Sequence, residues 1–432
     1  MITWLHRAGQ WTCWMSWLAW LAAPAPAAVP HVLHISVDAM SALYLKSYVS
    51  NNPAVFPNFR RLEQQAAFTY NARCDYDYSE TIPNHITMLT GRPVSQPAGQ
   101  PATTHHGFNQ NMPTAGATIH ANGNPAVPYK SSSLDMVHDR GMSVTILLGK
   151  SRLAICTNSY SAVNGAADTE GVDNGRKKFD RGVAMDMPSP NYGKAFVDEV
   201  STSLAGTPAN FTFLHIVDPD TVGHASGWGT AAWSNSMIRV DGYLGQLFTA
   251  IDGNPALAGK LAMIIVGDHG GTGSTHTDAT QIYNYTVPMF VWGPGFSPGS
   301  DLYGYFTNRA NPGTLRGDYG ADMPALRNGD TANLAMALLG LPVIPGSYFQ
   351  PALAFPGASR PCLALYPAPG AARLCVGWPA STNLVLEYSD SIGTNTQWLR
   401  VTQQITSDGT NNLLNVVPNP ATAGRYYRLR QN

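Results

Sequence analysis

Residues 31–38, with the sequence HVLHISVD, decide the fold. The run is mainly apolar, contains several β-branched residues and ends in an acid, Asp38. Apolar runs of this kind are typical of strands that are buried on both faces of a parallel sheet. We therefore predict a buried parallel strand here, with Asp38 at its carboxyl tip.

Two later apolar runs also end in acids. Residues 211–217 precede Asp218 and Asp220, and residues 261–267 precede Asp268 and His269. The alternation of such runs with helical patterns predicts an α/β fold with a mostly parallel sheet flanked by helices. Open sheets of this class place their sites beyond the carboxyl ends of the strands, so the acids should meet at one edge. Further strands are predicted at 143–148 and 287–292, and helices at 40–48, 56–65, 192–204, 237–251 and 331–339.

The sequence SETIPNHITMLTGR, residues 79–92, predicts a helix that begins at a threonine. Proline lies in its first turn, apolar residues fall on one face, and Gly91 would end it. Thr81 is then a candidate N-cap, and such a residue usually does no more than accept a backbone N–H. Because a helix N-terminus also attracts phosphate, the alternative is that the Thr81 hydroxyl is a nucleophile.

Length and charge narrow the classes of protein. The 432 residues suffice for one large domain and a small one. Charged residues make up 12% of the chain, and the formal net charge is −1. Binding of a nucleic acid polymer requires a basic face, so we expect none.

The first 27 residues resemble a secretory signal. A short segment with His6 and Arg7 precedes the apolar run 11–23, and residues 25–27 (APA) form a small-residue cleavage site. The alternative, a membrane anchor, needs an apolar run of about 20 residues. We therefore predict a secreted or periplasmic protein that is not stably inserted in a membrane after signal cleavage.

The mature chain would keep Cys74, Cys156, Cys362 and Cys375, an even number in an oxidising compartment. The last two are close enough in sequence to close a local loop, and the first two would form a long-range bridge. The chain has no Cys-x-x-Cys motif that would indicate redox or zinc-finger chemistry.

The C-terminal part has a different pattern. Residues 341–360 are rich in Pro, Gly and Ala, which indicates a boundary. Short, partly alternating runs follow, separated by turn residues, and they predict a small all-β domain. We therefore expect a catalytic domain over 29–355, and a linker with a small β-sandwich-like domain over 356–432.

Six side chains have the chemistry of a dinuclear zinc site, which needs carboxylates and imidazoles that converge from several elements. Each has a simpler explanation alone, since an acid after a strand often only starts a turn and a histidine can lie on the surface. Asp218 could also replace Asp220. Together with Thr81, however, the set favours one site. The six residues are Asp38, Asp220, His224, Asp268, His269 and His276.

Five motifs occur in the order found in a known family. Through them the chain resembles the alkaline phosphatase superfamily, and within it the type I phosphodiesterase/nucleotide pyrophosphatase branch. The resemblance covers about residues 29–355 and implies an alkaline-phosphatase-like core that hydrolyses small-molecule phosphate esters. The motifs are SVD at 36–38, TIPNH at 81–85 with TGR at 90–92, HG at 106–107, PDTVGH at 219–224 and DHGG at 268–271.

The resemblance also implies roles for the residues around the first zinc. Asp38, Asp268 and His269 would bind this ion, and Thr81 Oγ1 would be its fourth ligand. The Thr81 alkoxide would attack phosphorus and form a covalent phosphothreonine. Other divalent metals are alternatives to zinc.

The second zinc would be bound by Asp220, His224 and a further histidine. Many family members place that histidine far downstream, but this chain has none after His276, which therefore takes the role. Asn84 would donate its amide to a phosphate oxygen. Lys150, at the tip of a predicted strand, is a candidate contact for substrate anions, and the alternative is a solvated lysine.

Rival functions differ in what they require. A sulfatase of this superfamily needs a Cys or Ser nucleophile followed by Pro and Arg two and four places on, whereas Thr81 is followed by Pro83 and His85. A phosphomonoesterase and a phosphonate hydrolase are alternatives to the diesterase. A non-catalytic surface-binding protein, in which the β domain carries the function, is an alternative of another class.

Overall fold

A computed structural model describes most of the chain. The described residues are 28–188, 191–354 and the segments 364–367, 374–379, 384–389, 397–403, 405–407, 411–416 and 426–431. The chain divides into two compact units, of which the larger comprises residues 26–355. The predicted signal segment, residues 1–27, lies outside the described residues.

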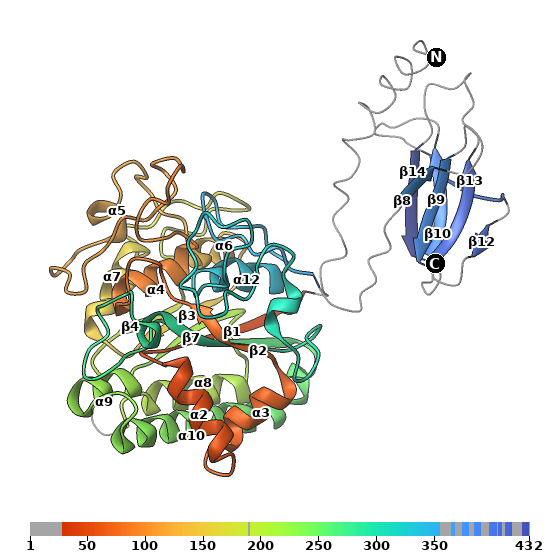
Figure 1. The fold of residues 1–432 in the computed structure, drawn as a ribbon. Helices are drawn as coiled ribbons and strands as arrows, with labels where there is room; N and C mark the ends of the chain where they lie inside the picture. The colour runs from red at the N-terminus through yellow and green to blue at the C-terminus, as the bar shows by residue number, and fades with distance from the viewer. Residues whose placement is uncertain are drawn as a thin grey trace. The chain divides into compact units, whose positions relative to one another are not determined.

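A seven-stranded sheet forms the centre of the larger unit (Figure 1). Its strands β1, β3, β4, β5 and β6 run parallel, and β7 is antiparallel to both β6 and β2. This topology confirms the predicted α/β class with a mostly parallel sheet. The order is β2 (Ala67–Arg73), β7 (Thr286–Trp292), β6 (Leu261–Gly267), β1 (His31–Val37), β5 (Phe211–Ile216), β3 (Val144–Leu148) and β4 (Arg181–Ala184).

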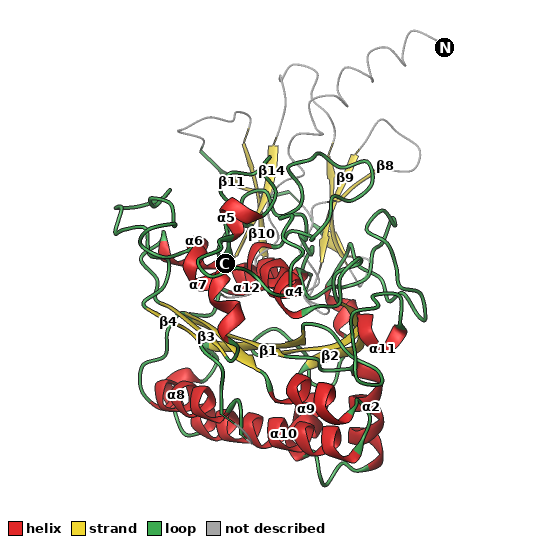
Figure 2. Cartoon of the chain, turned by 90° about the vertical axis from the view of Figure 1, so that its left-hand side faces the viewer, coloured by secondary structure: helices red, strands yellow, loops and turns green. Residues whose placement is uncertain are grey.

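Helices cover both faces of this sheet (Figures 1 and 2). One layer consists of α2 (Ala42–Asn51), α3 (Pro57–Gln65), α8 (Lys194–Ala205), α9 (Asp218–Ser226) and α10 (Ala231–Asp252). The other contains α4 (Thr81–Thr90), α6 (Ser133–His138), α7 (Ala154–Ser159) and α12 (Asp330–Leu338). Shorter elements are α5 (Ile119–Asn122), α11 (Ile282–Tyr285) and the 3₁₀ turns Ser151–Leu153, Pro255–Leu257 and Leu302–Tyr305.

Strand β1 sends alternate side chains into the two layers, as a pleated strand must. Leu33, Ile35 and Val37 belong to the core that contains residues of α2, α3 and α10. Val32 belongs to the core that contains residues of α4 and α12. Packing on both faces fixes the register of β1, and it places Asp38 directly beyond the carboxyl end of the strand.

The described strands of the C-terminal part form two antiparallel sheets. They agree with the all-β pattern of that region, and they belong to the second compact unit. One sheet has the order β11 (Leu399–Arg400), β10 (Leu384–Ser389) and β14 (Tyr426–Gln431). The other has the order β12 (Thr406–Ser407), β13 (Asn411–Val416), β9 (Leu374–Pro379) and β8 (Ala364–Pro367).

The long-range disulfide between Cys74 and Cys156 does not form. Both are free, buried thiols. Cys74 directly follows β2 and Cys156 lies on α7 after β3, and four strands separate β2 from β3. Strands about 4.8 Å apart place β2 and β3 on the order of 24 Å from each other, whereas a disulfide needs Cα atoms within about 7 Å. The expected loop between Cys362 and Cys375 falls outside the residues whose side chains are described.

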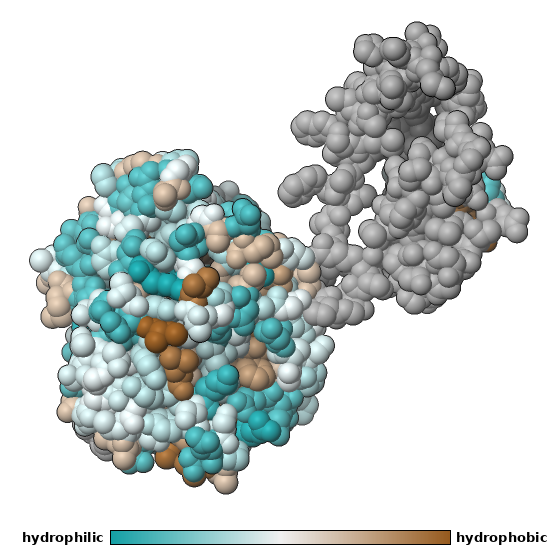
Figure 3. All heavy atoms as spheres, in the orientation of Figure 1, coloured by the Kyte–Doolittle hydropathy of each residue, from teal (hydrophilic) through white to brown (hydrophobic). Residues whose placement is uncertain are grey.

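The face of the larger unit that Figure 3 shows is mainly hydrophilic, with a short strip of strongly hydrophobic residues near its middle. Isolated apolar surface of this kind is normal for a soluble domain. None of the helices in the described part of the chain combines the length and the apolar character required to cross a bilayer.

Candidate active site

Helix α4 presents Thr81 at its first turn. The helix starts at Thr81 itself, and the N-cap position is occupied by Glu80 in an extended conformation. The interpretation of Thr81 as the N-cap is therefore wrong by one residue. Gly91 ends the helix with φ +63°, as predicted, because glycine adopts this left-handed conformation without strain.

The Thr81 hydroxyl is completely buried among charged side chains and histidines. Its Oγ1 lies 3.5 Å from Asp38 Oδ1 and 3.4 Å from His269 Nε2. Two cationic groups face the same oxygen, since Lys150 Nζ is 3.3 Å away and Arg152 Nη2 is 3.4 Å away. The arrangement turns this hydroxyl toward the ends of β1, β3 and β6 rather than toward the backbone of α4.

Asp38, Asp268 and His269 form a first group, with ligand atoms within 4.8 Å of one another. Asp268 Oδ1 accepts hydrogen bonds of 2.8 Å from the backbone N–H groups of Ala39 and His269. Its Oδ2 is buried and receives no hydrogen bond. His269 Nδ1 donates to Gly270 O at 2.8 Å, so Nε2 keeps its lone pair for the site.

Asp220, His224 and His276 form a second group, within the same 4.8 Å limit. Asp220 Oδ1 is buried without a hydrogen-bond partner. Both histidines donate from Nδ1 to carbonyl groups, His224 to Ser274 O at 3.2 Å and His276 to Ser79 O at 2.5 Å. Their Nε2 atoms are 3.2 Å apart, and each therefore presents a lone pair to the other.

The two groups fit divalent cations. Buried polar atoms nearly always have a partner, so the free oxygens of Asp220 and Asp268 indicate a missing electrophile. Each of these oxygens lies beside a histidine whose Nδ1–H donates to a backbone carbonyl. This hydrogen bond fixes the tautomer in which Nε2 has a lone pair, as is typical of histidines that bind a metal. Burial, and next the charge of His276, lowers the pKa of His269 well below its usual value, which keeps this ring neutral.

Lys150 connects the two groups. Its Nζ lies 2.6 Å from Asp38 Oδ2 and 2.5 Å from Asp220 Oδ2. Burial opposes the charge, but the two carboxylates raise the pKa of Lys150 and keep it protonated. The same ion pair contributes to Asp38, whose pKa lies well below its usual range despite burial, because Lys150 and His215 stabilise the carboxylate. Lys150 is therefore a buried residue of the site and not a solvated lysine.

Sequence reasoning did not single out Arg152. The residue follows Lys150 by two positions, in the 3₁₀ turn after β3, and its Nη2 also lies 4.0 Å from Asp220 Oδ2. The sequence does contain a pattern that could have identified Arg152. A Lys-x-Arg sequence follows a predicted strand, and the carboxyl ends of parallel strands lie at the edge where sites form.

Asn84 does not face the site as expected. Its Nδ2 donates to Tyr78 O and to Glu80 O, both at 2.9 Å. Its Oδ1 accepts from Asp75 N–H and from Asn328 Nδ2, also at 2.9 Å. Both amide hydrogens are therefore engaged within the protein, and Asn84 has none left for a phosphate oxygen.

A second asparagine, Asn111, contacts the first turn of α4. Its Oδ1 accepts a hydrogen bond of 3.1 Å from Ile82 N–H, in the first turn of α4. Among the described residues, no protein acceptor binds its Nδ2. Asn111 comes from the segment 93–127, in which the sequence shows no periodic pattern, so pattern reading could not locate it.

The accessible side of the site lies at the second group. The side chain of His224 is 47% exposed and that of Arg152 is 24% exposed, whereas Asp38 and Asp268 are fully buried. Of these four side chains, those of His224 and Arg152 are therefore the ones that solvent reaches.

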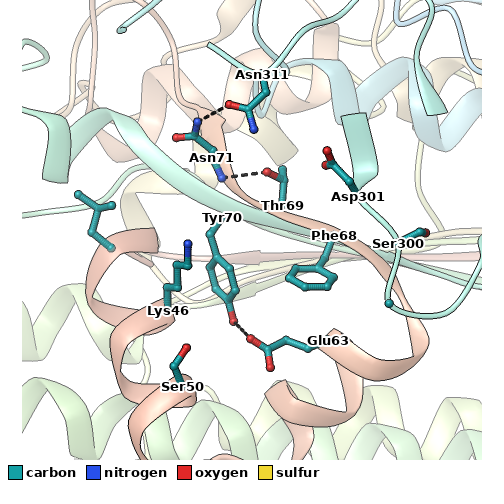
Figure 4. Close-up of a pocket in the computed structure, with 12 residues that line it drawn as sticks. Lys46, Ser50, Glu63, Phe68, Thr69, Tyr70, Asn71, Ser300, Asp301 and Asn311 are labelled. Carbon is teal, nitrogen blue, oxygen red and sulfur yellow. Dashed lines mark hydrogen bonds between the residues drawn. The ribbon is translucent and has the colours of Figure 1, made fainter. Parts of the chain in front are cut away.

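A cavity of about 620 Å³ lies elsewhere, beside the edge strand β2 (Figure 4). Phe68 and Tyr70 line it together with Lys46 of α2 and Glu63 of α3, and Glu63 accepts a hydrogen bond of 2.9 Å from Tyr70. No residue of the two metal-binding groups lines this cavity. It is therefore not the place where Thr81 would meet a substrate.

Comparisons with known proteins agree with this geometry. The sequence profile of the type I phosphodiesterase / nucleotide pyrophosphatase family matches residues 135–288, which contain Lys150 and all of the second group. No curated protein is similar enough in sequence to count as a relative. Among solved structures, a 2-O GAG sulfatase matches with a TM-score of 0.50 at 11% identity, over 81% of this chain and 80% of that chain.

Two further solved structures are similar. An inactive variant of murine ectonucleotide pyrophosphatase/phosphodiesterase 5 in complex with AMP has a TM-score of 0.48 at 12% identity, over 73% of this chain and 96% of that chain. A protein in the alkaline phosphatase superfamily from Vibrio parahaemolyticus has a TM-score of 0.47 at 12% identity, over 82% and 76% of the two chains.

The fold has an alkaline-phosphatase-like core, and the chain is a hydrolase. Residues 135–288 are similar in sequence to the type I phosphodiesterase/nucleotide pyrophosphatase family. Its general class is that of a phosphoric ester hydrolase, and its two side-chain groups are candidates for divalent metal ions.

Proposed function

We propose that the protein is a secreted phosphodiesterase of the nucleotide pyrophosphatase type, which acts on small phosphate esters through a covalent phosphothreonine at Thr81. The strongest support is the position of the Thr81 hydroxyl, which lies beside Asp38 and His269 of the first group and beside Lys150, whose Nζ contacts carboxylates of both groups. The family profile over residues 135–288 supports the diester substrate class.

Two zinc ions are the proposed cofactors. Asp38, Asp268, His269 and Thr81 would hold one, and a second would be held by Asp220, His224 and His276. Bound zinc lowers the pKa of a coordinated hydroxyl and offsets negative charge on phosphate oxygens. The unpartnered oxygens of Asp268 and Asp220 suit such ligation. So do the Nε2 lone pairs of the three histidines, whose Nδ1 atoms donate to backbone carbonyls.

Residues of the chain carry the first half of the reaction. Thr81 Oγ1, after losing its proton to water, attacks phosphorus, and the bond from phosphorus to the leaving oxygen breaks as the bond from Oγ1 to phosphorus forms. Lys150 and Arg152 would donate hydrogen bonds to the phosphate oxygens from their positions beside Oγ1. Asn111 Nδ2 would donate a third, because Ile82 N–H fixes the orientation of its amide.

The second half regenerates the enzyme. A water molecule attacks phosphorus, the bond from Thr81 Oγ1 to phosphorus breaks, and Thr81 takes back a proton. The phosphate product then leaves past His224, on the exposed side of the site. Substrates that must reach a buried hydroxyl are small molecules, which agrees with the absence of a basic face in the sequence.

A phosphomonoesterase is the second candidate, and one observation favours it. Two protonated side chains, Lys150 and Arg152, lie within 3.4 Å of Thr81 Oγ1. A monoester is dianionic near neutral pH and a diester is monoanionic, so two cations at the phosphate favour the monoester more.

The test compares turnover of bis-p-nitrophenyl phosphate with that of p-nitrophenyl phosphate, before and after treatment with a chelator. The diesterase proposal predicts preference for the diester and loss of activity on chelation, restored by zinc. Strong preference for the monoester would overturn the diesterase proposal in favour of the second candidate. Full activity after chelation would overturn the metal-dependent site in both. Secretion is tested separately, by N-terminal sequencing of exported protein for cleavage after residue 27.

A further inference from the structure

His215 is a buried histidine next to the site that the proposed mechanism does not use. It is the penultimate residue of β5, where it lies beside Ser36 of β1 and Leu148 of β3. Its side chain is completely buried. A titratable ring at the centre of a parallel sheet has to satisfy both of its nitrogen atoms, because an unpaired polar atom there is costly.

The hydrogen bonds of His215 fix its tautomer. Gly149 N–H lies 3.1 Å from Nδ1, and a backbone N–H can only donate, so Nδ1 carries the lone pair. The proton of the neutral ring is then on Nε2, which lies 3.0 Å from Asp38 Oδ2 and donates to it.

The two oxygens of Asp38 consequently face different partners. Oδ2 receives the hydrogen bond from His215 and the contact with Lys150 Nζ. Oδ1 faces Thr81 Oγ1 and His269 Nε2, each at 3.5 Å. Rotation of the carboxylate would exchange the oxygens, and the bond from His215 opposes that rotation.

His215 is itself held in place, whereas Lys150 has a flexible stem. The ring of His215 packs edge-on against that of His85, with ring centroids 4.6 Å apart and planes at 85°. His85 in turn donates from Nδ1 to Thr81 O at 2.7 Å, and its Nε2 is 3.0 Å from Ser36 Oγ. The position of His215 therefore depends on β1, β3 and the first turn of α4.

We propose that His215 is a positioning residue for Asp38. It orients the carboxylate so that Oδ1 faces Thr81 Oγ1 and His269 Nε2. The proposal rests on the proposed function, because Asp38 is taken there as a metal ligand. Hydrogen-bonding partners of metal ligands typically change metal affinity by about 10- to 100-fold when they are removed.

Two substitutions separate the two hydrogen bonds of this ring. In His215→Asn the side-chain oxygen occupies the place of Nδ1 and can accept from Gly149, but nothing reaches Asp38. In His215→Gln the side-chain amide occupies the place of Nε2 and can donate to Asp38. Zinc affinity is measured by competition with a chromogenic chelator on metal-stripped protein, with thermal unfolding as the control for folding.

His215→Asn should weaken the binding of one of two zinc ions by about 10- to 100-fold, and His215→Gln should restore affinity close to that of the wild type. Equal affinity in the Asn variant and the wild type, or a loss of the same size in both variants, would overturn the positioning role alone. A wild-type protein that binds no zinc would overturn the proposed function and this inference with it.

A measurement on the wild type covers the case in which the Asn variant does not fold. Histidine labelled with ¹⁵N distinguishes the two neutral tautomers by the chemical shifts of the ring nitrogens, and the signals that disappear in His215→Gln assign the residue. We expect a proton on Nε2. A proton on Nδ1 would overturn the proposal.

Discussion

His276 Nδ1 donates a hydrogen bond of 2.5 Å to the carbonyl oxygen of Ser79, two residues before Thr81. The Ser79 hydroxyl also donates to the backbone carbonyl of His276. These bonds connect the loop after β6 to the segment that leads into α4. A histidine only eight residues beyond Asp268 can therefore complete the second group, although many family members place it far downstream.

Replacing His276 should remove the second metal ion. His276→Ala takes away both the Nε2 lone pair and the bond to Ser79, so we expect metal content to fall from two ions to one and kcat to fall by at least about 100-fold. Metal content is measured by elemental analysis after dialysis. His31→Ala at the opposite end of β1 is the control and should keep both ions, and two ions in the His276 variant would contradict the assignment.

Arg152 should increase the kcat/KM of substrates that carry more negative charge on the phosphate. Arg152→Gln removes a cation that lies 3.4 Å from Thr81 Oγ1, so kcat/KM should fall by about 10- to 100-fold more for p-nitrophenyl phosphate than for bis-p-nitrophenyl phosphate. Arg181→Gln, which breaks an exposed ion pair with Glu199, is the matched control. Equal losses for both substrates would show that Arg152 does not recognise the charge of the phosphate.

His34 should make the fold sensitive to acid. Burial lowers the pKa of His34 from 6.5 to about 3, and its Nε2 has no hydrogen-bond partner beside Phe213. Between these values the unfolded chain binds the extra proton, so the folded state is fully stabilised above pH 6.5 and loses stability as pH falls. The loss is at most about 1.4 kcal/mol per pH unit.

The substitution His34→Leu removes this titration without leaving a polar atom in the core. The free energy of unfolding, measured in urea at about pH 7.5 and about pH 5, should therefore fall less for the variant than for the wild type. Identical changes in the two proteins would mean that His34 is protonated as readily in the folded state as in the unfolded state.

The two buried thiols, Cys74 and Cys156, should not react with thiol reagents in the native protein. Burial raises the pKa of Cys156 to about 12 and that of Cys74 as well, so neither offers the thiolate that thiol reagents attack. In native protein treated with such a reagent, peptide mapping should find both unmodified, and both should react after unfolding. Modification in the native state, or a peptide that joins Cys74 to Cys156, would contradict their separation across the sheet.

The parts of the fold that follow from local pattern were predictable. The run of β6 is continuously apolar and that of β1 is mainly apolar, and the residues that follow them predict that Asp38, Asp268 and His269 meet at one sheet edge. Strands β2 and β4 were missed because they are edge strands with mixed polarity, whose pairing partners lie far away in the sequence. The antiparallel direction of β7 is likewise set by tertiary pairing.

Hydrogen-bond partners were the least predictable part of the site. Asn84 follows Thr81 by three positions, yet its amide is engaged by Tyr78 and Glu80. Asn111 faces the first turn of α4 from a segment without periodicity. Which of two asparagines keeps a free amide depends on contacts that only the folded chain defines.

The most direct test of the central claim is to trap the phosphorylated enzyme. Wild-type protein with zinc is mixed with excess bis-p-nitrophenyl phosphate, quenched in acid within the first turnover and digested, and the peptide containing Thr81 is analysed by mass spectrometry. We predict the added mass of the phosphoryl intermediate on Thr81, its absence in Thr81→Ala, and a loss of activity in that variant of at least about 1000-fold. An unmodified Thr81 peptide from a protein that turns over the substrate, together with undiminished activity of Thr81→Ala, would contradict the account.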